Sequence, residues 1–296
     1  MPMTRRKNSR LAAVVMPLLL GTCALAAADV ESVATGRAAL DRGDLDAAIA
    51  QLEKAVAGAP SNAEAHYLLG VSYARKGEKE GLFGGMSLFK RAKAEWLRAV
   101  ELNPDGIDAR FSLIDFYMNA PGIAGGSEAK ALEHAAEIRK RDALEGHRAY
   151  ARVFTFQKKH DAAAKEMAEA VREQPGSAKA HYFLGNALLN QADWKGSLRE
   201  YETAVSLDAA YMPPYLRIGQ HAARSESNYP RGEEALRKYL AYKPAFDEPG
   251  LGNAWYWLGV IQEKNGQKAE ARESYLNAQK LAPNLKELAE ALKRVR

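Results

Sequence analysis

Two arginines one helical turn apart are the most suggestive pair of side chains in this sequence. Arg148 and Arg152 are four residues apart, so on a helix both guanidinium groups project from the same face. A guanidinium presents N–H donors in a planar fork that matches a carboxylate, and two of them together could clamp one carboxylate group. The alternative is that they pair with acidic neighbours in the chain, such as Glu145. The sequence leaves both possibilities open.

Sequence signatures of catalysis are absent from the chain. It contains no G-x-S-x-G, no phosphate-binding loop with its lysine, no G-x-G-x-x-G, no H-E-x-x-H and no C-x-x-C. The composition, 47% hydrophobic and 27% charged, is that of a folded protein without low-complexity tracts. We therefore expect no enzyme activity, no cofactor and no bound metal ion.

Two glycine-containing segments are candidates for ligand contacts. Residues 120–127 lead into a helix whose N-terminal amides could bind an anion, and the alternative is an ordinary turn with Ser127 as the N-cap. Residues 81–89 are interpreted either as a folded-back cap on a lengthened helix or as a docking surface for a partner. The large apolar side chains of that possible docking insertion are Leu82, Phe83, Met86 and Phe89.

The first 28 residues are typical of a secretory signal and not of a folded domain. An apolar run over residues 11–20 is followed by small residues and preceded by four basic ones, Arg5, Arg6, Lys7 and Arg10. The run is shorter than the roughly 20 residues that cross a bilayer. Residues 1–28 are predicted to be removed on export, which makes the mature chain periplasmic or secreted. A retained membrane anchor is the alternative.

Removal of this segment changes the charge and the thiol chemistry of the chain. Because the segment carries four basic residues and no acidic one, the formal net charge falls from +5 to about +1. That balance gives no reason to expect nucleic acid or an anionic membrane as a partner. Cys23 is the only cysteine, so cleavage leaves no thiol for a disulfide or a metal site. A lipid anchor at Cys23 is a minor alternative, since Thr22 fits a lipoprotein box poorly.

A pattern of small and large residues recurs along the chain. One instance returns at identical spacing about a hundred residues later: Ala163, Met167, Ala170 and Pro175 recur as Ala271, Tyr275, Ala278 and Pro283. Self-similarity at a period near 34 residues is the signature of stacked helical repeats. The pattern resembles the tetratricopeptide repeat (TPR) family, whose unit is a pair of antiparallel helices.

The TPR resemblance implies small residues at repeat positions 8 and 20 and a large residue at position 24. Position 8 falls on Gly36, Gly70, Ile114, Ala151, Gly185, Gly219 and Gly259. Position 20 falls on Ala48, Ala92, Ala131, Ala163, Ser197, Gly232 and Ala271. We expect the two helices of a repeat to nest where these positions meet. The residue at position 24 is expected to fill the gap toward the next repeat. Ile114 departs from the pattern.

The resulting fold prediction is an all-α superhelical solenoid of about seven TPR helix pairs. The predicted repeats cover residues 29–62, 63–106, 107–143, 144–177, 178–211, 212–246 and 252–285. Residues 286–296 are predicted to form a C-terminal capping helix, because apolar residues at helical spacing line one face and charged residues the other. Such a helix shields the last apolar surface of a stack.

The resemblance also assigns places to the histidines and to a binding groove. His66, His147 and His181 fall at position 4, where a flat, bulky side chain packs, so a core role is favoured over metal binding or base catalysis. In TPR proteins the first helices line a concave groove that holds peptides. The predicted groove residues are Tyr67, Arg75, Phe111, Arg148, Arg152, Tyr182, Asn186, Gln220, Arg224 and Tyr256.

The resemblance implies a non-catalytic scaffold of the cell envelope that binds a protein or peptide in this groove. One alternative is a glycan- or phosphate-handling or enzyme-associated protein, in which Trp194, Trp255, Trp257 or the Gly-rich segment 120–127 would meet a sugar or a phosphate, although most of these rings fall at packing positions. The other is a structural solenoid that assembles with itself. The sequence leaves the partner and the oligomeric state open.

Overall fold

The computed structural model of the chain describes residues 31–244 and 248–296. The predicted signal segment, with Cys23, lies outside these residues. Within them the chain is helical with short connections and has no strand. It divides into two compact units, Met1–Leu113 and Ile114–Arg296. None of the described helices combines the length and the apolar character needed to cross a membrane.

The first unit contains the helices of the N-terminal repeats. Residues 31–41 are helical. They are followed by α2 (Leu45–Gly58), α3 (Ala63–Gly84), α4 (Met86–Leu102) and the start of α5 (Asp108–Asn119). Asp44 and Asn62 begin α2 and α3 as N-caps, since each side chain accepts a hydrogen bond from the backbone amide three residues on.

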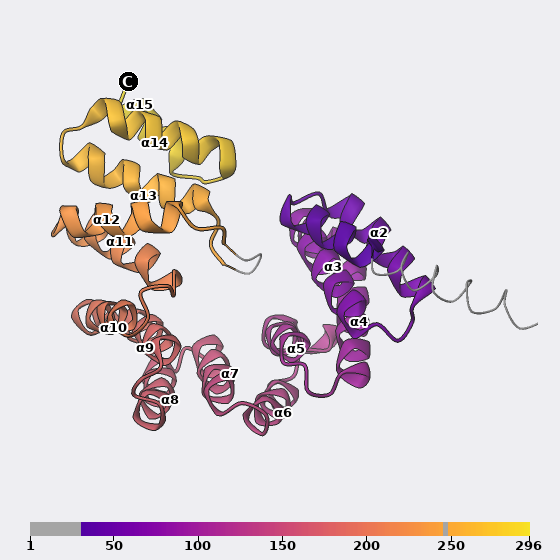
Figure 1. Cartoon of the computed structure of the whole chain (residues 1–296). Coiled ribbons are helices and arrows are strands. Elements are labelled where there is room, and N and C mark those ends of the chain that lie inside the picture. The colour runs from indigo at the N-terminus through magenta and orange to yellow at the C-terminus, as the bar shows by residue number, and fades with distance from the viewer. Residues whose placement is uncertain (1–30, 245–247) are drawn as a thin grey trace, which may run out of the picture. The chain divides into compact units, whose positions relative to one another are not determined.

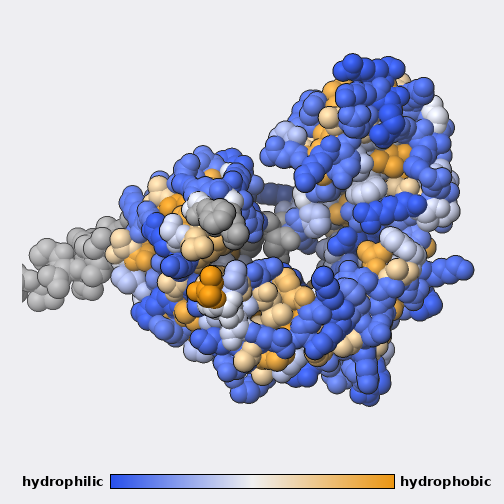
Figure 2. Space-filling model, turned by 180° about the vertical axis from the view of Figure 1, so that it is seen from behind, coloured by the Kyte–Doolittle hydropathy of each residue, from blue (hydrophilic) through white to orange (hydrophobic). Residues whose placement is uncertain are grey.

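The second unit contains the end of α5 and the helices that follow it. They are η1 (Gly122–Ala124), α6 (Glu128–Arg139), α7 (Ala143–Phe156), α8 (His160–Glu173), α9 (Ala178–Asn190), α10 (Trp194–Leu207), α11 (Pro213–Ser225), α12 (Tyr229–Leu240), α13 (Leu251–Lys264), α14 (Lys268–Leu281) and α15 (Leu288–Arg294). Successive helices pack as hairpins, most visibly α9 with α10, α11 with α12 and α13 with α14 (Figure 1). Figure 2 shows a face on which hydrophilic residues predominate and apolar residues form small patches.

The glycines at repeat position 8 are where the two helices of a pair come closest. A Cβ atom built on them would lie 2.2 to 2.6 Å from the side chain at position 24 of the same repeat. The pairs are Gly36 with Leu52, Gly70 with Trp96, Gly185 with Tyr201, Gly219 with Leu236 and Gly259 with Tyr275. The side chain at position 24 thus covers the glycine of its own repeat, and Leu236 and Tyr275 also belong to apolar clusters with residues of the helices that follow.

The third predicted repeat reverses the sizes at these two positions. Ile114 stands where the other repeats have glycine or alanine, and Ala135 stands at position 24. Both side chains are completely buried. In the repeat register a large residue on the first helix is thus combined with a small residue on the second, the reverse of the other repeats.

Residues 78–91 lengthen the hairpin of α3 and α4. Gly81 interrupts α3 with a φ of 76°, a left-handed conformation that glycine adopts without strain. Gly85 lies against the backbone of Gly77, where a Cβ atom would be 2.3 Å from the Gly77 carbonyl oxygen, and the Phe89 ring covers Gly77. This is the lengthened-helix interpretation. Of the possible docking insertion, Met86 is 42% exposed, while the side chains of Leu82 and Phe83 lie outside the description.

Residues 120–127 form a compact turn. Backbone amides of Ala124 and Gly126 both donate to the Pro121 carbonyl, and the Ser127 hydroxyl accepts from the Lys130 amide at the start of α6. The N-cap interpretation of Ser127 therefore describes this segment. Ile123, at the tip of the turn, is completely exposed.

The last helix covers the apolar face of α14. Leu288, Ala291 and Val295 pack with Tyr275 and its neighbours Ala271 and Ala278. Arg294 fixes this helix to α13 through two hydrogen bonds to Glu263, of 2.6 and 2.9 Å. The stack thus ends on a surface with charged residues outside.

Candidate functional site

A pocket of about 410 Å³ lies on the second unit, between α7 and α9. We call it the α7–α9 pocket. Its floor and walls include Ala151, Phe156, Met167, Phe183 and Ala187, and its polar rim is formed by Arg148, Arg152, Asn186 and Asn190. Four predicted groove residues line it together: Arg148, Arg152, Tyr182 and Asn186. They sit at positions 5 and 9 of two consecutive predicted repeats.

Arg152 is held by a carboxylate of the preceding repeat. Its guanidinium makes two hydrogen bonds to Asp115 on α5, one of them 2.5 Å between Nη2 and Oδ2. Both side chains are partly exposed. The bidentate geometry neutralises Arg152 and fixes its orientation along the groove wall.

Arg148 is also occupied, by a carboxylate that is itself almost inaccessible. Glu145 is only 2% exposed and accepts from Arg148 at 2.9 Å, while Lys179 of α9 binds its other oxygen. The Arg148 guanidinium lies over the Phe183 ring at 4.7 Å. Of the two possibilities that the sequence left open, the pairing with Glu145 is the one seen. The two arginines do not present themselves as an empty clamp.

The amide groups on the rim are oriented by their neighbours. The Tyr201 hydroxyl donates to Asn186 Oδ1 at 2.9 Å, and the NH₂ group of this pocket-lining residue is its remaining hydrogen-bond donor. Burial raises the pKa of Tyr201 above its ordinary value, which keeps this hydroxyl protonated at neutral pH. Asn190 is exposed at the end of α9. The pocket therefore offers N–H donors around an apolar floor.

A second group of groove side chains lies two repeats further on. Arg224, at the end of α11, places its guanidinium 4.9 Å from the centre of the Trp257 ring on α13. Tyr256 meets Trp257 edge-on at 5.1 Å. Trp257 and Phe183 occupy the same repeat position, whereas Arg224 lies at position 13 of its repeat and Arg148 at position 5. We call this group the Arg224–Trp257 platform.

The remaining predicted groove residues do not line the α7–α9 pocket. Gln220 accepts a hydrogen bond from Arg217 at 3.1 Å. In the first unit, Arg75 lines a separate hollow of about 380 Å³ together with Lys79. Tyr67 is partly buried and Phe111 is buried.

The three histidines at position 4 are buried, and each of them makes hydrogen bonds to other parts of the chain in addition to packing. His66 bonds Glu95 at 2.5 Å through Nδ1 and the Pro60 carbonyl at 3.1 Å through Nε2. His181 repeats the arrangement with Glu200 and Pro175, and His147 lies between Glu166 and Glu173. The acidic partner 19 residues after His147 and His181 was the signal in the sequence that could have revealed these hydrogen bonds.

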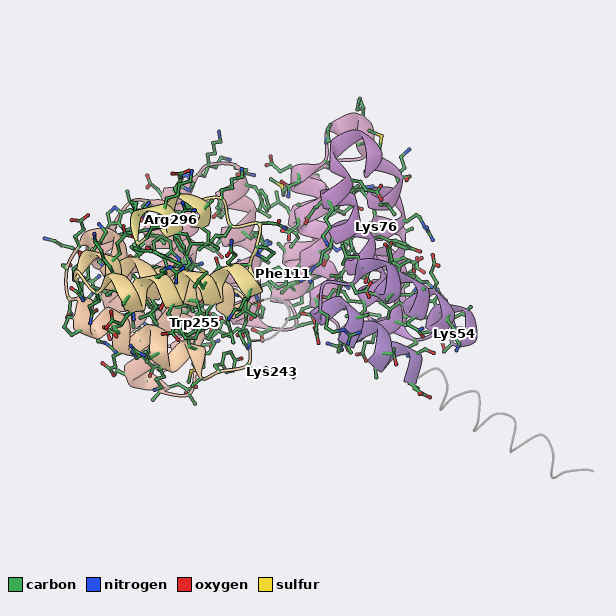
Figure 3. The ribbon with its side chains drawn as sticks, turned by 90° about the horizontal axis from the view of Figure 1, so that it is seen from above. Lys54, Lys76, Phe111, Lys243, Trp255 and Arg296 are labelled. Carbon is green, nitrogen blue, oxygen red and sulfur yellow. The ribbon has the colours of Figure 1, made fainter. Side chains whose placement is uncertain are left out.

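The aromatic residues of the glycan alternative take different places. Trp194 is 43% exposed and meets His221 edge-on. Trp255, on α13 (Figure 3), packs against the apolar core. Among the residues that the structure describes, no group of three or more His, Cys, Asp or Glu side chains is arranged to hold a metal ion.

Known sequence families account for this repeat pattern. TPR family profiles match residues 36–77, described as a TPR repeat, and residues 148–211 and 252–285, each described as a tetratricopeptide repeat. The chain belongs to the tetratricopeptide repeat family. TPR units of this kind are typical of scaffolds for protein–protein interaction.

Solved TPR structures share the fold at low sequence identity. A TPR protein from Parabacteroides merdae is 15% identical, with a TM-score of 0.52 over 90% of this chain and 98% of that one. The human IFIT1 dimer with PPP-AAAA is 20% identical, with a TM-score of 0.57 over 85% and 59%. Yeast Tom70 is 14% identical, with a TM-score of 0.56 over 84% and 59%. At such identities the likeness concerns the fold alone.

A curated relative matches a smaller part of the chain. The general transcriptional corepressor ssn6 of Schizosaccharomyces pombe is 22% identical over 130 residues. That match spans 44% of this chain and 11% of the relative. This match indicates a similar repeat sequence and gives no information about the role of this chain.

Proposed function

We propose that this TPR protein is a non-catalytic scaffold that holds a segment of another polypeptide in the α7–α9 pocket. The observation that carries the proposal is the convergence of Arg148, Arg152, Tyr182 and Asn186 on one pocket of about 410 Å³. A volume of this size accommodates a side chain and its flanking backbone.

The chemistry of the pocket favours a polypeptide over a sugar or a phosphate. Its floor is apolar, which suits an aliphatic or aromatic side chain. The donors on its rim, such as the Asn186 NH₂ group, suit backbone carbonyl oxygens. Asp115 is paired with Arg152, and Glu145 is shared by Arg148 and Lys179, so these five side chains leave an excess of one positive charge, which is little for a phosphate.

We further propose that the scaffold works outside the cytoplasm, in the periplasm or beyond. Residues 1–28 have the basic, apolar and small-residue order of a secretory signal, which supports this location. Fractionation of cells that express the full chain tests it, with a Leu18→Arg variant in the apolar run as comparison. Export of the full chain and its loss in the variant are expected. Equal cytoplasmic retention of both contradicts the location.

Affinity capture with a variant that fills the pocket tests the binding site. Asn190→Trp places a large ring at the mouth of the pocket from an exposed position, so the core is left intact. Gln174→Trp, at the exposed C-cap of α8 and away from the pocket, is the matched control. Charge reversal of Arg148 and Arg152 is a poorer test, because it would put new carboxylates beside Glu145 and Asp115.

The expected result is a set of envelope polypeptides that the unmodified chain and Gln174→Trp retain and Asn190→Trp loses. Circular dichroism should give the same helix content for all three proteins. A captured set that does not change when the pocket is filled contradicts the proposed site.

A further inference from the structure

The Arg224 side chain differs from the two pocket arginines in its electrostatic environment. Arg148 and Arg152 are each bonded to a carboxylate of this chain. No ion pair or hydrogen bond connects Arg224 to a carboxylate in the part of the chain that the structure describes, although the side chain is exposed. It is held by the face of Trp257, which leaves the edge of the guanidinium and its N–H donors open.

Two acidic residues near the platform are paired with other cations, whereas burial and, second to it, the charge of nearby Glu287 raise the pKa of the Tyr256 hydroxyl. Glu226, two residues after Arg224, pairs with Lys264. Glu263, on the same helix as Trp257, accepts from Arg294 and from the Tyr275 hydroxyl. The positive charge of Arg224 is therefore not compensated by these two paired carboxylates.

We propose that the Arg224–Trp257 platform binds an aspartate or glutamate side chain of the same polypeptide segment whose apolar residue enters the α7–α9 pocket. This inference rests on the proposed function and gives it a ligand class, an extended segment with one apolar anchor and one acidic residue. The Trp257 face holds the guanidinium in place before the ligand arrives, so less side-chain freedom is lost when the carboxylate binds. Trp257 is thus a positioning residue, and Arg224 is the residue that contacts the ligand.

The distance between the α7–α9 pocket and the Arg224–Trp257 platform determines how far apart the apolar and the acidic residue lie in the ligand. The α7–α9 pocket and the platform are two steps apart in the row of first helices α7, α9, α11 and α13. The separation of the apolar anchor and the acidic residue in the ligand must match the distance between these two sites, and a peptide series in which this separation is varied determines it.

Short labelled peptides test the inference by fluorescence polarisation. The probes carry one Leu and one Glu in a Ser-rich background, with the separation of the two varied one residue at a time, and each has a twin in which Gln replaces Glu. They are measured on the unmodified chain, on Arg224→Gln and on Arg237→Gln. Arg237 is an exposed α12 arginine paired with Glu233, which makes it the matched control.

The expected result is that Glu peptides bind about five- to tenfold more tightly than their Gln twins at the favoured separation. Arg224→Gln removes this preference, and Arg237→Gln keeps it. A Lys peptide should in turn prefer Arg224→Glu over the unmodified chain, which reports charge recognition independently of overall stability.

Two results overturn the inference and are distinguishable. If peptides bind and are lost with Asn190→Trp, but Glu and Gln twins bind equally, the platform does not recognise an acidic residue and the proposed pocket function stands. If no peptide of the series binds the unmodified chain, the inference and the proposed function fail together.

Discussion

The α7–α9 pocket and the Arg224–Trp257 platform share the repeat position of one aromatic ring and differ in the position and the pairing of the arginine beside it. Both place an arginine beside an aromatic ring at position 6, Phe183 in one and Trp257 in the other. In the pocket each arginine is paired with a carboxylate, Glu145 or Asp115, whereas the platform arginine has no such partner among the described residues. The charge that a groove arginine offers to a ligand is therefore set by the neighbouring helices and not by the arginine alone.

In the repeats that form the pocket and the platform, a small residue at position 8 packs against the large residue at position 24. Replacing that small residue by a larger one should have the largest effect on stability. Gly185→Val places carbon atoms where the Tyr201 ring lies, since a Cβ there would be 2.5 Å from it. We expect a loss of about 3 kcal/mol in the free energy of unfolding, measured by urea denaturation. Gly176→Ala, where a Cβ meets no atom within 4 Å, should be nearly neutral. A small effect of Gly185→Val would contradict the close approach of α9 and α10.

The repeats also differ at position 4, where the pocket side has His181 and the platform side has Trp255. His181→Phe keeps the flat ring but leaves Glu200 and the Pro175 carbonyl without this partner. We expect a loss of about 2 kcal/mol, because a buried carboxylate then has one hydrogen bond fewer. Trp255→Phe should cost about 1 kcal/mol, since only apolar contacts change. Equal melting temperatures for His181→Phe and the unmodified chain would show that the hydrogen bonds of His181 to Glu200 and Pro175 are not formed.

One substitution can give the α7–α9 pocket an arginine without a carboxylate partner, as in the Arg224–Trp257 platform. Asp115→Asn takes the carboxylate away from Arg152, so the pocket should acquire an uncompensated arginine like that of the platform. The pair is partly exposed, and the expected stability loss is about 1 kcal/mol or less. The affinity for peptides with Glu next to the apolar anchor should rise about threefold relative to their Gln twins. Unchanged peptide preference would mean that Arg152 does not reach the ligand.

The pair that closes the platform end of the stack should give the smallest effect and a defined pH dependence. The hydrogen bonds from Arg294 hold the pKa of Glu263 below its ordinary value of 4.5. A carboxyl whose pKa is lowered on folding adds stability above the unfolded value and loses it as the pH falls through the folded value. Arg294→Gln should therefore lower stability by about 0.5–1 kcal/mol at pH 7. In thermal melts the difference from the unmodified chain should shrink once the pH falls below 4.5.

The fold was predictable because the pattern of small and large residues that specifies it is local in sequence and recurs in each repeat. The glycines at position 8 and the alanines at position 20 could be located by spacing alone, and the all-helical TPR fold followed. The contact of position 24 with the glycine of its own repeat was not predicted, since spacing does not reveal which way a side chain points. Ile114 departs from the size pattern in a repeat whose position 24 is the small Ala135, and both side chains are buried.

The site was predictable in part. Spacing and family register placed Arg148, Arg152, Tyr182 and Asn186 on one surface, where they line a pocket. Pairing of Arg148 with Glu145 was foreseeable because the two are three residues apart on one helix. The bond between Arg152 and Asp115 joins residues 37 positions apart in different repeats, which no local pattern reports.

Site-specific photo-crosslinking tests most directly whether the α7–α9 pocket holds a polypeptide. Cys23 is the only cysteine of the chain, so a Cys23→Ser background with Asn190→Cys or Gln174→Cys gives a single attachment point for a photoreactive label. We predict that a label at the pocket forms a covalent adduct with a peptide segment, identified by mass spectrometry, and that the label at Gln174 does not. Equal adducts at both positions, or none at Asn190 in the presence of envelope proteins, would contradict a polypeptide-binding groove.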